Sequence, residues 1–289
     1  MNKFYSICKF LFVLSLISRE GFTQSPDSLI AQKEYGLAAV LYEKQIFELS
    51  QSVLSEDSLR RTYNLLLRKK IQAQKSQRTF EDAWQTAQRF DLSEPDKALA
   101  FGMRYETVLC GYLAQRYNET YGQLQQAKFY TQDSLLTESL QVLEILTLNE
   151  LERWTESKEI FRRYVARKGL NIEVDELYKF VKKKPKNAEK AQLLSFFMPG
   201  LGQVYAGYPK EGFFSLGLQA LALGFGVYHV WHKYYFIGFL SGASLFQSLY
   251  FGGGRRAAIM AETINRRQKV TNNQQIRQVA LEAETKKAK

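Results

Sequence analysis

The pattern of hydrophobic and polar positions divides the chain into two parts. Between residues 24 and 190, apolar residues recur at helical spacing among Gln, Glu, Lys and Arg. Residues 191–254 contain Lys210, Glu211 and Lys233 as their only full charges. Segments of about 20 apolar residues match the hydrocarbon thickness of a bilayer. The pattern therefore predicts an all-α protein in which a water-facing helical domain is joined to a membrane domain.

Four aromatic residues mark a repeated helical pattern in the first part. Each is followed by a small residue three positions later and by an apolar or small residue seven positions later, so that all three share one helical face. The aromatic positions are 45, 37 and 37 residues apart, and Ile71, Val108 and Ile145 stand nine positions before the last three. We expect each unit to be a helical hairpin. The aromatic and small residues are Tyr35 and Ala38, Phe80 and Ala83, Tyr117 and Thr120, and Trp154 and Ser157.

The segment from Lys33 to Lys44, with the sequence KEYGLAAVLYEK, resembles the turn and second helix of a tetratricopeptide repeat. That family has a period of about 34 residues and stacks its hairpins into a curved solenoid, whose concave surface holds a peptide or a partner helix. The copies here are longer and lack the family's proline at each hairpin end. The resemblance implies a degenerate solenoid over residues 24–170. An irregular helical bundle whose aromatic side chains fill the core is the alternative.

Two apolar segments, residues 212–231 and 234–254, are each long enough to cross a bilayer as a helix. Only His232 and Lys233 separate them, so the sequence predicts a tight transmembrane hairpin of antiparallel helices. Backbone groups in lipid must be hydrogen-bonded internally, which helices achieve.

Small and aromatic residues in these segments suit helix contact and interfacial anchoring. Small residues four positions apart let helices approach closely, and Ala220 with Gly224 and Gly238 with Gly242 have this spacing. Tyr and Trp rings favour the membrane–water interface. The aromatic residues at the predicted ends of the spans are Trp231, Tyr234, Tyr235 and Tyr250.

A glycine-rich segment precedes the first predicted span. It runs from Ser195 to Tyr208 with the sequence SFFMPGLGQVYAGY. This segment resembles the PGxGQxY signature of small two-transmembrane-type bacterial domains, over roughly residues 190–270, and the resemblance implies membrane residence. Pro199 lacks a backbone donor and the glycines loosen the chain, which predicts either a broken third span or a re-entrant turn. The motif residues are Pro199, Gly200, Gly202, Gln203, Tyr205, Gly207 and Gly212.

Three further segments complete the organisation. Residues 1–23 have the basic start and short apolar run of a signal peptide, with an uncleaved anchor as the alternative. Residues 171–190 are predicted to be a basic helical linker. The lysine run at 182–186 in this linker either lies against anionic lipid headgroups or is a solvated helix end. Residues 255–289 are predicted to be a basic amphipathic tail.

The topology predicted from these segments contains a conflict. A cleaved signal places the repeats outside the cytoplasm, which predicts an inner-membrane protein of the bacterial envelope with its repeats facing the periplasm. Two spans then return Arg255 and Arg256 to that same side, against the tendency of basic residues to stay in the cytoplasm. A third span would remove the conflict for these two residues.

The candidate chemistry is sparse. The net charge is +11, but the basic residues concentrate beside the spans and in the tail, which favours anionic lipid headgroups over nucleic acid as the partner. His229 and His232 lack a nearby Asp, Glu or Cys to complete a metal site. The GGGRR run at 252–256 follows a predicted span instead of a strand and lacks the Walker lysine. We therefore expect no enzyme activity, no metal and no cofactor.

Together these features predict a membrane-anchored helical-repeat scaffold that binds a protein or peptide partner at the cell envelope. A second hypothesis assigns the function to the membrane domain, which would homo-oligomerise through its helices as a small pore or a transport or assembly accessory, with the repeats recruiting partners.

Overall fold

The computed structural model describes residues 24–51, 55–131 and 134–285, and within these ranges it contains helices and turns but no strand. The predicted all-α class is confirmed. The chain divides into two compact units, Met1–Gly169 and Leu170–Lys289. The predicted signal peptide lies outside the described residues.

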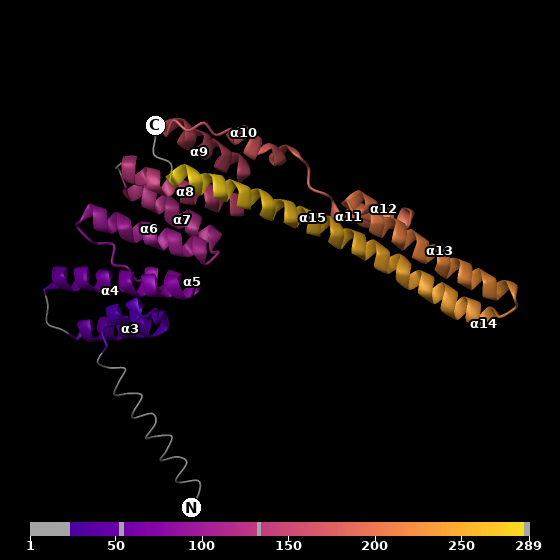
Figure 1. The fold of residues 1–289 in the computed structure, drawn as a ribbon, viewed down its shortest axis with the longest axis horizontal. Coiled ribbons are helices and arrows are strands. Elements are labelled where there is room, and N and C mark those ends of the chain that lie inside the picture. The colour runs from indigo at the N-terminus through magenta and orange to yellow at the C-terminus, as the bar shows by residue number, and fades with distance from the viewer. Residues whose placement is uncertain (1–23, 52–54, 132–133, 286–289) are drawn as a thin grey trace, which may run out of the picture. The chain divides into compact units, whose positions relative to one another are not determined.

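The first unit is a succession of helices, each of which packs against its neighbours along the chain (Figure 1). Its apolar core consists of successive clusters between these helices, and the thiol of Cys110 is fully buried in one of them with Ile71 and Met103. The helices are α2 (Pro26–Ala31), α3 (Tyr35–Ser50), α4 (Glu56–Gln77), α5 (Phe80–Ala87), α6 (Lys97–Leu113), α7 (Tyr117–Tyr130), α8 (Ser134–Glu150) and α9 (Trp154–Arg167).

One turn geometry recurs before α3, α5, α7 and α9. A residue with φ between 61° and 66° ends the preceding helix, and the predicted aromatic residue begins the next helix two positions later. In each turn the backbone N–H after this residue bonds the carbonyl five positions earlier, as in Thr79 to Gln74 at 3.0 Å, which is the Schellman pattern. The left-handed residues are Lys33, Arg78, Gln115 and Glu152.

The small residues of the repeated pattern lie in the interior of the first unit. Ala38, Ala83, Thr120 and Ser157 are all fully buried. A larger side chain at these positions would have to displace the helix before the turn, which explains why only small residues occur there.

The second unit contains short helices followed by a long pair. The predicted helical linker over 171–190 is helical only in part, because the chain between the 3₁₀-helix and α11 is not helical. Pro185 disfavours helix for the residue before it, and Asn187 caps α11 by accepting a hydrogen bond from the N–H of Lys190 at 2.8 Å. The elements are α10 (Val174–Leu177), the 3₁₀-helix Lys179–Lys182, α11 (Ala188–Phe197), α12 (Leu201–Ala206), α13 (Pro209–Trp231), α14 (Tyr235–Ile237), the π-helix Gly238–Ala243 and α15 (Ser244–Thr285).

The second predicted span differs from the expectation at both ends. It begins as α14 and the π-helix. Helix α15 then continues without a break through residue 254 to Thr285. The described part of the predicted tail is therefore a continuation of the span and not a separate helix. The glycines at 252–254 remain helical. A Cβ on Gly254 would lie 2.4 Å from the ring of Phe196, so this glycine serves close packing against α11 and does not end the helix.

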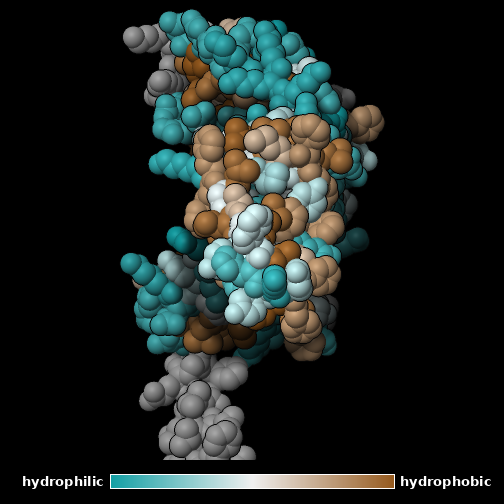
Figure 2. Space-filling model, turned by 90° about the vertical axis from the view of Figure 1, so that its right-hand side faces the viewer, coloured by the Kyte–Doolittle hydropathy of each residue, from teal (hydrophilic) through white to brown (hydrophobic). Residues whose placement is uncertain are grey.

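Among the described residues, α13 is the one helix long and apolar enough to cross a membrane. Only 17% of its most apolar window is buried. Large apolar side chains are exposed along it and in the following turn, including Phe213, Leu221 and Trp231. Viewed end-on, the tip of this helical pair presents mainly apolar and intermediate side chains (Figure 2).

Candidate functional site

The glycine-rich motif breaks the chain into α11 and α12. Gly200 and Gly207 flank α12 with φ of 88° and 98°, a left-handed conformation that glycine adopts without strain. Half-buried Pro199 lies in the break. Because α11 has 10 residues and α12 has 6, neither is long enough to span a bilayer. The segment is therefore a pair of short helices separated at Pro199 and Gly200, and the choice between a broken third span and a re-entrant turn stays a prediction.

Three motif glycines permit contacts that a side chain would prevent. A Cβ on Gly202 would lie 1.9 Å from the backbone oxygen of Ala191 in α11. A Cβ on Gly200 would lie 2.1 Å from the oxygen of Gly212 at the start of α13, and a Cβ on Gly212 would lie 2.6 Å from the oxygen of Gly200. The glycine spacing is thus a steric requirement for packing α12 between its neighbours.

Gln203 joins α11, α12 and α15 through buried hydrogen bonds. The hydroxyl of Ser195 donates to its Oε1 at 2.9 Å, and its Nε2 donates to the carbonyl of Gly253 at 3.1 Å. Gln203 is 1% exposed, and a buried amide is stabilising only when it is hydrogen-bonded. The motif glutamine therefore connects the three helices.

Tyr205 occupies the polar end of the same joint. Its hydroxyl accepts a hydrogen bond from the N–H of Asn187 at 3.2 Å, and the ammonium groups of Lys186 and Lys190 lie 4.8 and 5.5 Å from its ring centroid. Cation–π attraction favours this arrangement. Nearby, the side chain of Asn265 bonds both the N–H and the carbonyl of Lys186. The motif residues build a helix joint with a basic rim.

The contact between α13 and the segment after the turn uses one of the two predicted small-residue pairs, Gly238 with Gly242, but Gly226 takes the place of Ala220 and Gly224. Gly226 lies against Gly238 and Gly242, and a Cβ on Gly242 would lie 2.4 Å from the Cα of Gly226. Ala220 and Gly224 are exposed instead. Two stripes of small residues run along α13, and spacing alone cannot show which stripe meets the other helix.

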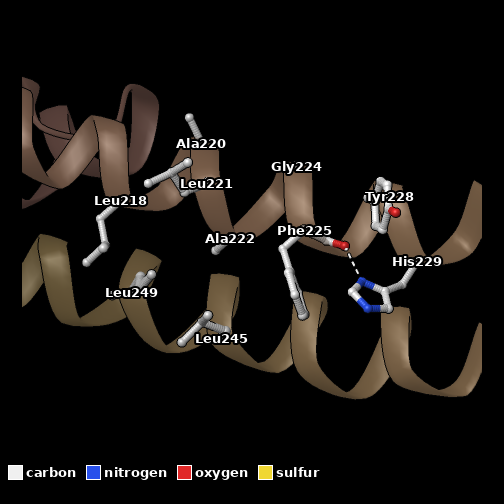
Figure 3. Close-up of a pocket in the computed structure, with 10 residues that line it drawn as sticks. All are labelled: Leu218, Ala220, Leu221, Ala222, Gly224, Phe225, Tyr228, His229, Leu245 and Leu249. Atoms are coloured by element: carbon white, nitrogen blue, oxygen red, sulfur yellow. Dashed lines mark hydrogen bonds between the residues drawn. The ribbon is translucent and has the colours of Figure 1, made fainter.

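Ala220 and Gly224 line an open apolar groove between α13 and α15 (Figure 3). Leu245 and Leu249 of α15 form its other side, and Phe225 and His229 lie toward the tip. The groove has a volume of about 730 Å³. The Nδ1 of His229 lies 2.9 Å from the carbonyl oxygen of Phe225, and His232 bonds the carbonyl of Tyr228 in the same way.

The first unit has a groove of about 790 Å³ between α3, α4 and α5. The side chains of Val40 and Phe47 in this groove are 63% and 65% exposed. Glu43 lines this groove, and Lys70 and Arg89 approach its carboxylate to 2.6 and 2.9 Å. The guanidinium of Arg89, followed by the ammonium of Lys70, lowers the pKa of the Glu43 carboxyl. The groove thus has an apolar lining and an internally paired charge.

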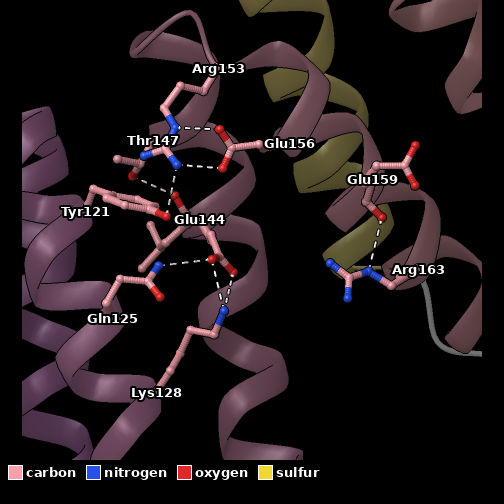
Figure 4. A network of polar contacts seen from close by, with 10 residues as sticks. Tyr121, Gln125, Lys128, Glu144, Thr147, Arg153, Glu156, Glu159 and Arg163 are labelled. Carbon is pink, nitrogen blue, oxygen red and sulfur yellow. Dashed lines mark hydrogen bonds and ion pairs between the residues drawn. The ribbon is translucent and has the colours of Figure 1, made fainter.

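A second groove lies between α7, α8 and α9 (Figure 4). Here the ammonium of Lys128 lies 2.9 Å from the buried carboxylate of Glu144, to which Gln125 also donates at 3.3 Å. The guanidinium of Arg153 stacks over the ring of Tyr121 at 4.3 Å. Glu144 stands ten positions before its helix-starting aromatic residue, as Lys70 does before Phe80. Equivalent positions of two units therefore carry opposite charges.

These groove residues were not predicted from the sequence. Their spacing from the aromatic residues could have identified them. Glu43 and Gln125 each stand eight positions after the aromatic residue that begins their helix. Each contacts the residue that stands ten positions before the aromatic residue of the following unit. No group of three or more His, Cys, Asp or Glu side chains suited to a metal ion occurs in the described residues. No family model, curated protein or solved structure matches the chain.

Proposed function

We propose that this protein is a membrane-anchored helical-repeat scaffold that binds a protein partner at the bacterial envelope. The observation that supports membrane residence most strongly is the low burial of α13. Protein covers only 17% of the most apolar window of this helix. A core helix of a water-soluble protein would be covered. Lipid accounts for the exposed apolar side chains.

The dimensions of α13 suit this placement. Its 23 residues extend over about 35 Å, compared with a hydrocarbon thickness of about 30 Å. Trp231, Tyr234 and Tyr235 are exposed at the tip, where aromatic rings anchor to the interface. At the other end Arg256 pairs with Glu211 at 2.5 Å. We place the apolar band of a transmembrane hairpin between these two levels.

The repeats are the proposed binding part, arranged as a degenerate tetratricopeptide-like solenoid. The recurring turn, the buried small residues and the packing of each helix on its chain neighbours support a solenoid over an irregular bundle. The groove at Val40 and Phe47 suits a peptide or helix that supplies apolar side chains. The carboxylate of Glu43 is already paired with Lys70 and Arg89, so the exposed apolar side chains are what the groove offers to a partner.

We further propose the inner membrane as the location, with the repeats in the periplasm and the basic segments against anionic headgroups. The N-terminal segment favours this orientation, whereas the charge distribution favours the reverse, since Lys233 is the only full charge at the tip and Lys210, Arg255 and Arg256 lie at the other end. Cysteines introduced at His232 and Gln275, in a Cys8→Ser, Cys110→Ala background, distinguish the two. Labelling of Gln275→Cys by an impermeant maleimide before permeabilisation supports the periplasmic placement of the repeats. Labelling of His232→Cys alone overturns that placement.

The function itself is tested by extraction and cross-linking. Alkaline carbonate should leave the full-length protein in the membrane pellet, and release into the supernatant would contradict the proposal. A photo-cross-linking residue at Phe47 should give a discrete protein adduct, whereas one at Arg61, an exposed residue of α4 outside the groove, should not. Equal adducts at both positions would contradict partner binding in the groove.

A second candidate function is favoured by the open groove at Ala220 and Gly224, which leaves small residues of α13 available to another membrane helix. In this case the membrane domain would assemble into a small pore or transport accessory. Deleting residues 24–169 would then leave the cellular phenotype intact.

A further inference from the structure

A polar stripe lies on the outer face of α15, within the segment that we place in the bilayer. Ser244, Gln247 and Ser248 are exposed, with offsets of three and four residues that put them on one helical face. Gly242 and Gly253 of the same segment contact α13, and the stripe lies on the opposite side of the helix. The apolar groove of Figure 3 is on a third side, lined by Leu245 and Leu249.

No hydrogen bond joins the side chains of Ser244, Gln247 or Ser248 to any other described residue. Gln247 precedes Gly254 by seven residues, or about 10 Å along the helix, which places its amide about a third of the way into a hydrocarbon layer of about 30 Å. An amide facing lipid at that depth is costly because lipid offers it neither donor nor acceptor. The stripe therefore requires a protein partner in the membrane.

The chemistry of the stripe indicates what that partner is. The amide of Gln247 carries both a donor and an acceptor, so two copies related by a two-fold axis satisfy each other without any third group. The stripe is uncharged, so it offers nothing to select a charged helix. Self-complementarity favours a second copy of the same chain.

The same face continues beyond the apolar band with matching charges. Arg255, Glu262 and Arg266 are exposed and lie within about 100° of the stripe around the helix axis. None of them has an ion pair with another residue on this face in the described part of the chain. In two parallel copies, Glu262 of one helix approaches Arg266 of the other, an arrangement that fixes the orientation of paired helices. Two copies in one membrane are necessarily parallel.

We propose that two copies of this protein pair along α15, through Ser244, Gln247 and Ser248 in the bilayer and through Glu262 and Arg266 outside it. This pairing rests on the proposed membrane residence of the hairpin. It differs from assembly through Ala220 and Gly224, which lie on another side of the hairpin.

Disulfide cross-linking of the full chain in membranes tests the pairing. In a Cys8→Ser, Cys110→Ala background, Ser248→Cys should give a disulfide-linked homodimer on mild oxidation, and Phe251→Cys one turn further should do the same. Ala220→Cys in the groove is the matched control and should remain monomeric. A homodimer at Ala220→Cys alone, or an adduct of Ser248→Cys with a different protein, would overturn the proposed contact.

The contribution of the amide is measured separately. Gln247→Leu should raise the dissociation constant of the dimer in detergent about fivefold or more, while Gln275→Leu in the tail should leave it unchanged. An unchanged constant in Gln247→Leu would refute the role of the stripe. A monomer that stays in the membrane after carbonate extraction overturns only the pairing, whereas a protein released by carbonate overturns the proposed function as well.

Discussion

The hydroxyl of Ser157 donates a hydrogen bond to the backbone carbonyl of Ile145, twelve residues earlier, at 3.0 Å. The same separation brings Gly238 to Gly226 in the second unit, where a Cβ on Gly238 would lie 2.9 Å from the Gly226 carbonyl oxygen. Lys233 there has φ of 64° and precedes the helix-starting aromatic residue by two positions, as in the repeats. The hairpin in the second unit thus uses the helix–turn–helix geometry of the first.

The contact at Ser157 predicts how the protein responds to a larger residue at that position. Ser157→Val should lower the free energy of unfolding by roughly 1–3 kcal/mol, because the site is fully buried and a larger side chain forces the paired helices apart. Thr155→Val, at an exposed position of the same helix, should change it by less than about 0.5 kcal/mol. Urea unfolding followed by circular dichroism measures both. Equal effects would show that the contact is not tight.

The left-handed turn residues give a prediction of the opposite sign. Arg78 has φ of 66° and an exposed side chain, and this conformation costs a residue with a Cβ about 1–2 kcal/mol. Arg78→Gly should therefore stabilise the protein by roughly 0.5–1 kcal/mol, after the greater unfolded-state entropy of glycine is subtracted. Arg68→Gly, in the middle of α4, should destabilise it by about 1 kcal/mol. Thermal unfolding of the two variants would contradict this account if both melted earlier than the parent.

The sequence predicted the helices and the buried repeat positions well because both depend on local spacing. The aromatic residues at Tyr35, Phe80, Tyr117 and Trp154 begin helices, and the small residues after them are buried. The predicted helical linker over 171–190 failed locally, because Pro185 interrupts it and Asn187 starts a new helix. The predicted end near Gly254 failed because tertiary packing against Phe196 decided it. The carbonyl of Phe196 accepts a hydrogen bond from the hydroxyl of Tyr250, 54 residues later, and no local pattern reports such a contact.

The charged groove residues lead to a prediction about pH. Arg89 and Lys70 lower the pKa of the Glu43 carboxyl in the folded protein. Its ion pairs therefore stabilise the fold fully above the ordinary pKa of 4.5. This contribution is lost as the pH falls through the lowered pKa. Glu43→Gln should therefore destabilise the protein by less than about 1 kcal/mol at pH 7, since the pair is partly exposed.

The difference between Glu43→Gln and the parent should shrink as the pH falls below 4.5 and through the lowered pKa of the parent carboxyl, which then becomes neutral as well. Urea midpoints measured at pH 7 and pH 3 give this comparison. Glu48→Gln on the same helix is the control, because its contact with Lys44 is longer, at 3.6 Å, and more exposed. A difference of the same size at both pH values would show that Glu43 acts through its shape and not its charge.

The choice between the two small-residue stripes of α13 can be tested with one substitution on each. Gly226 is buried against Gly242, so Gly226→Leu should separate the hairpin helices and destabilise the second unit by more than about 3 kcal/mol. Gly224 is exposed, and a Cβ added to it would meet no heavy atom within 4 Å, so Gly224→Leu should be tolerated and should favour helix by about 1 kcal/mol. Protease resistance of the detergent-solubilised protein reports the difference. Loss of resistance in Gly224→Leu with retention in Gly226→Leu would mean that the stripe chosen from spacing alone, Ala220 with Gly224, is the one that packs.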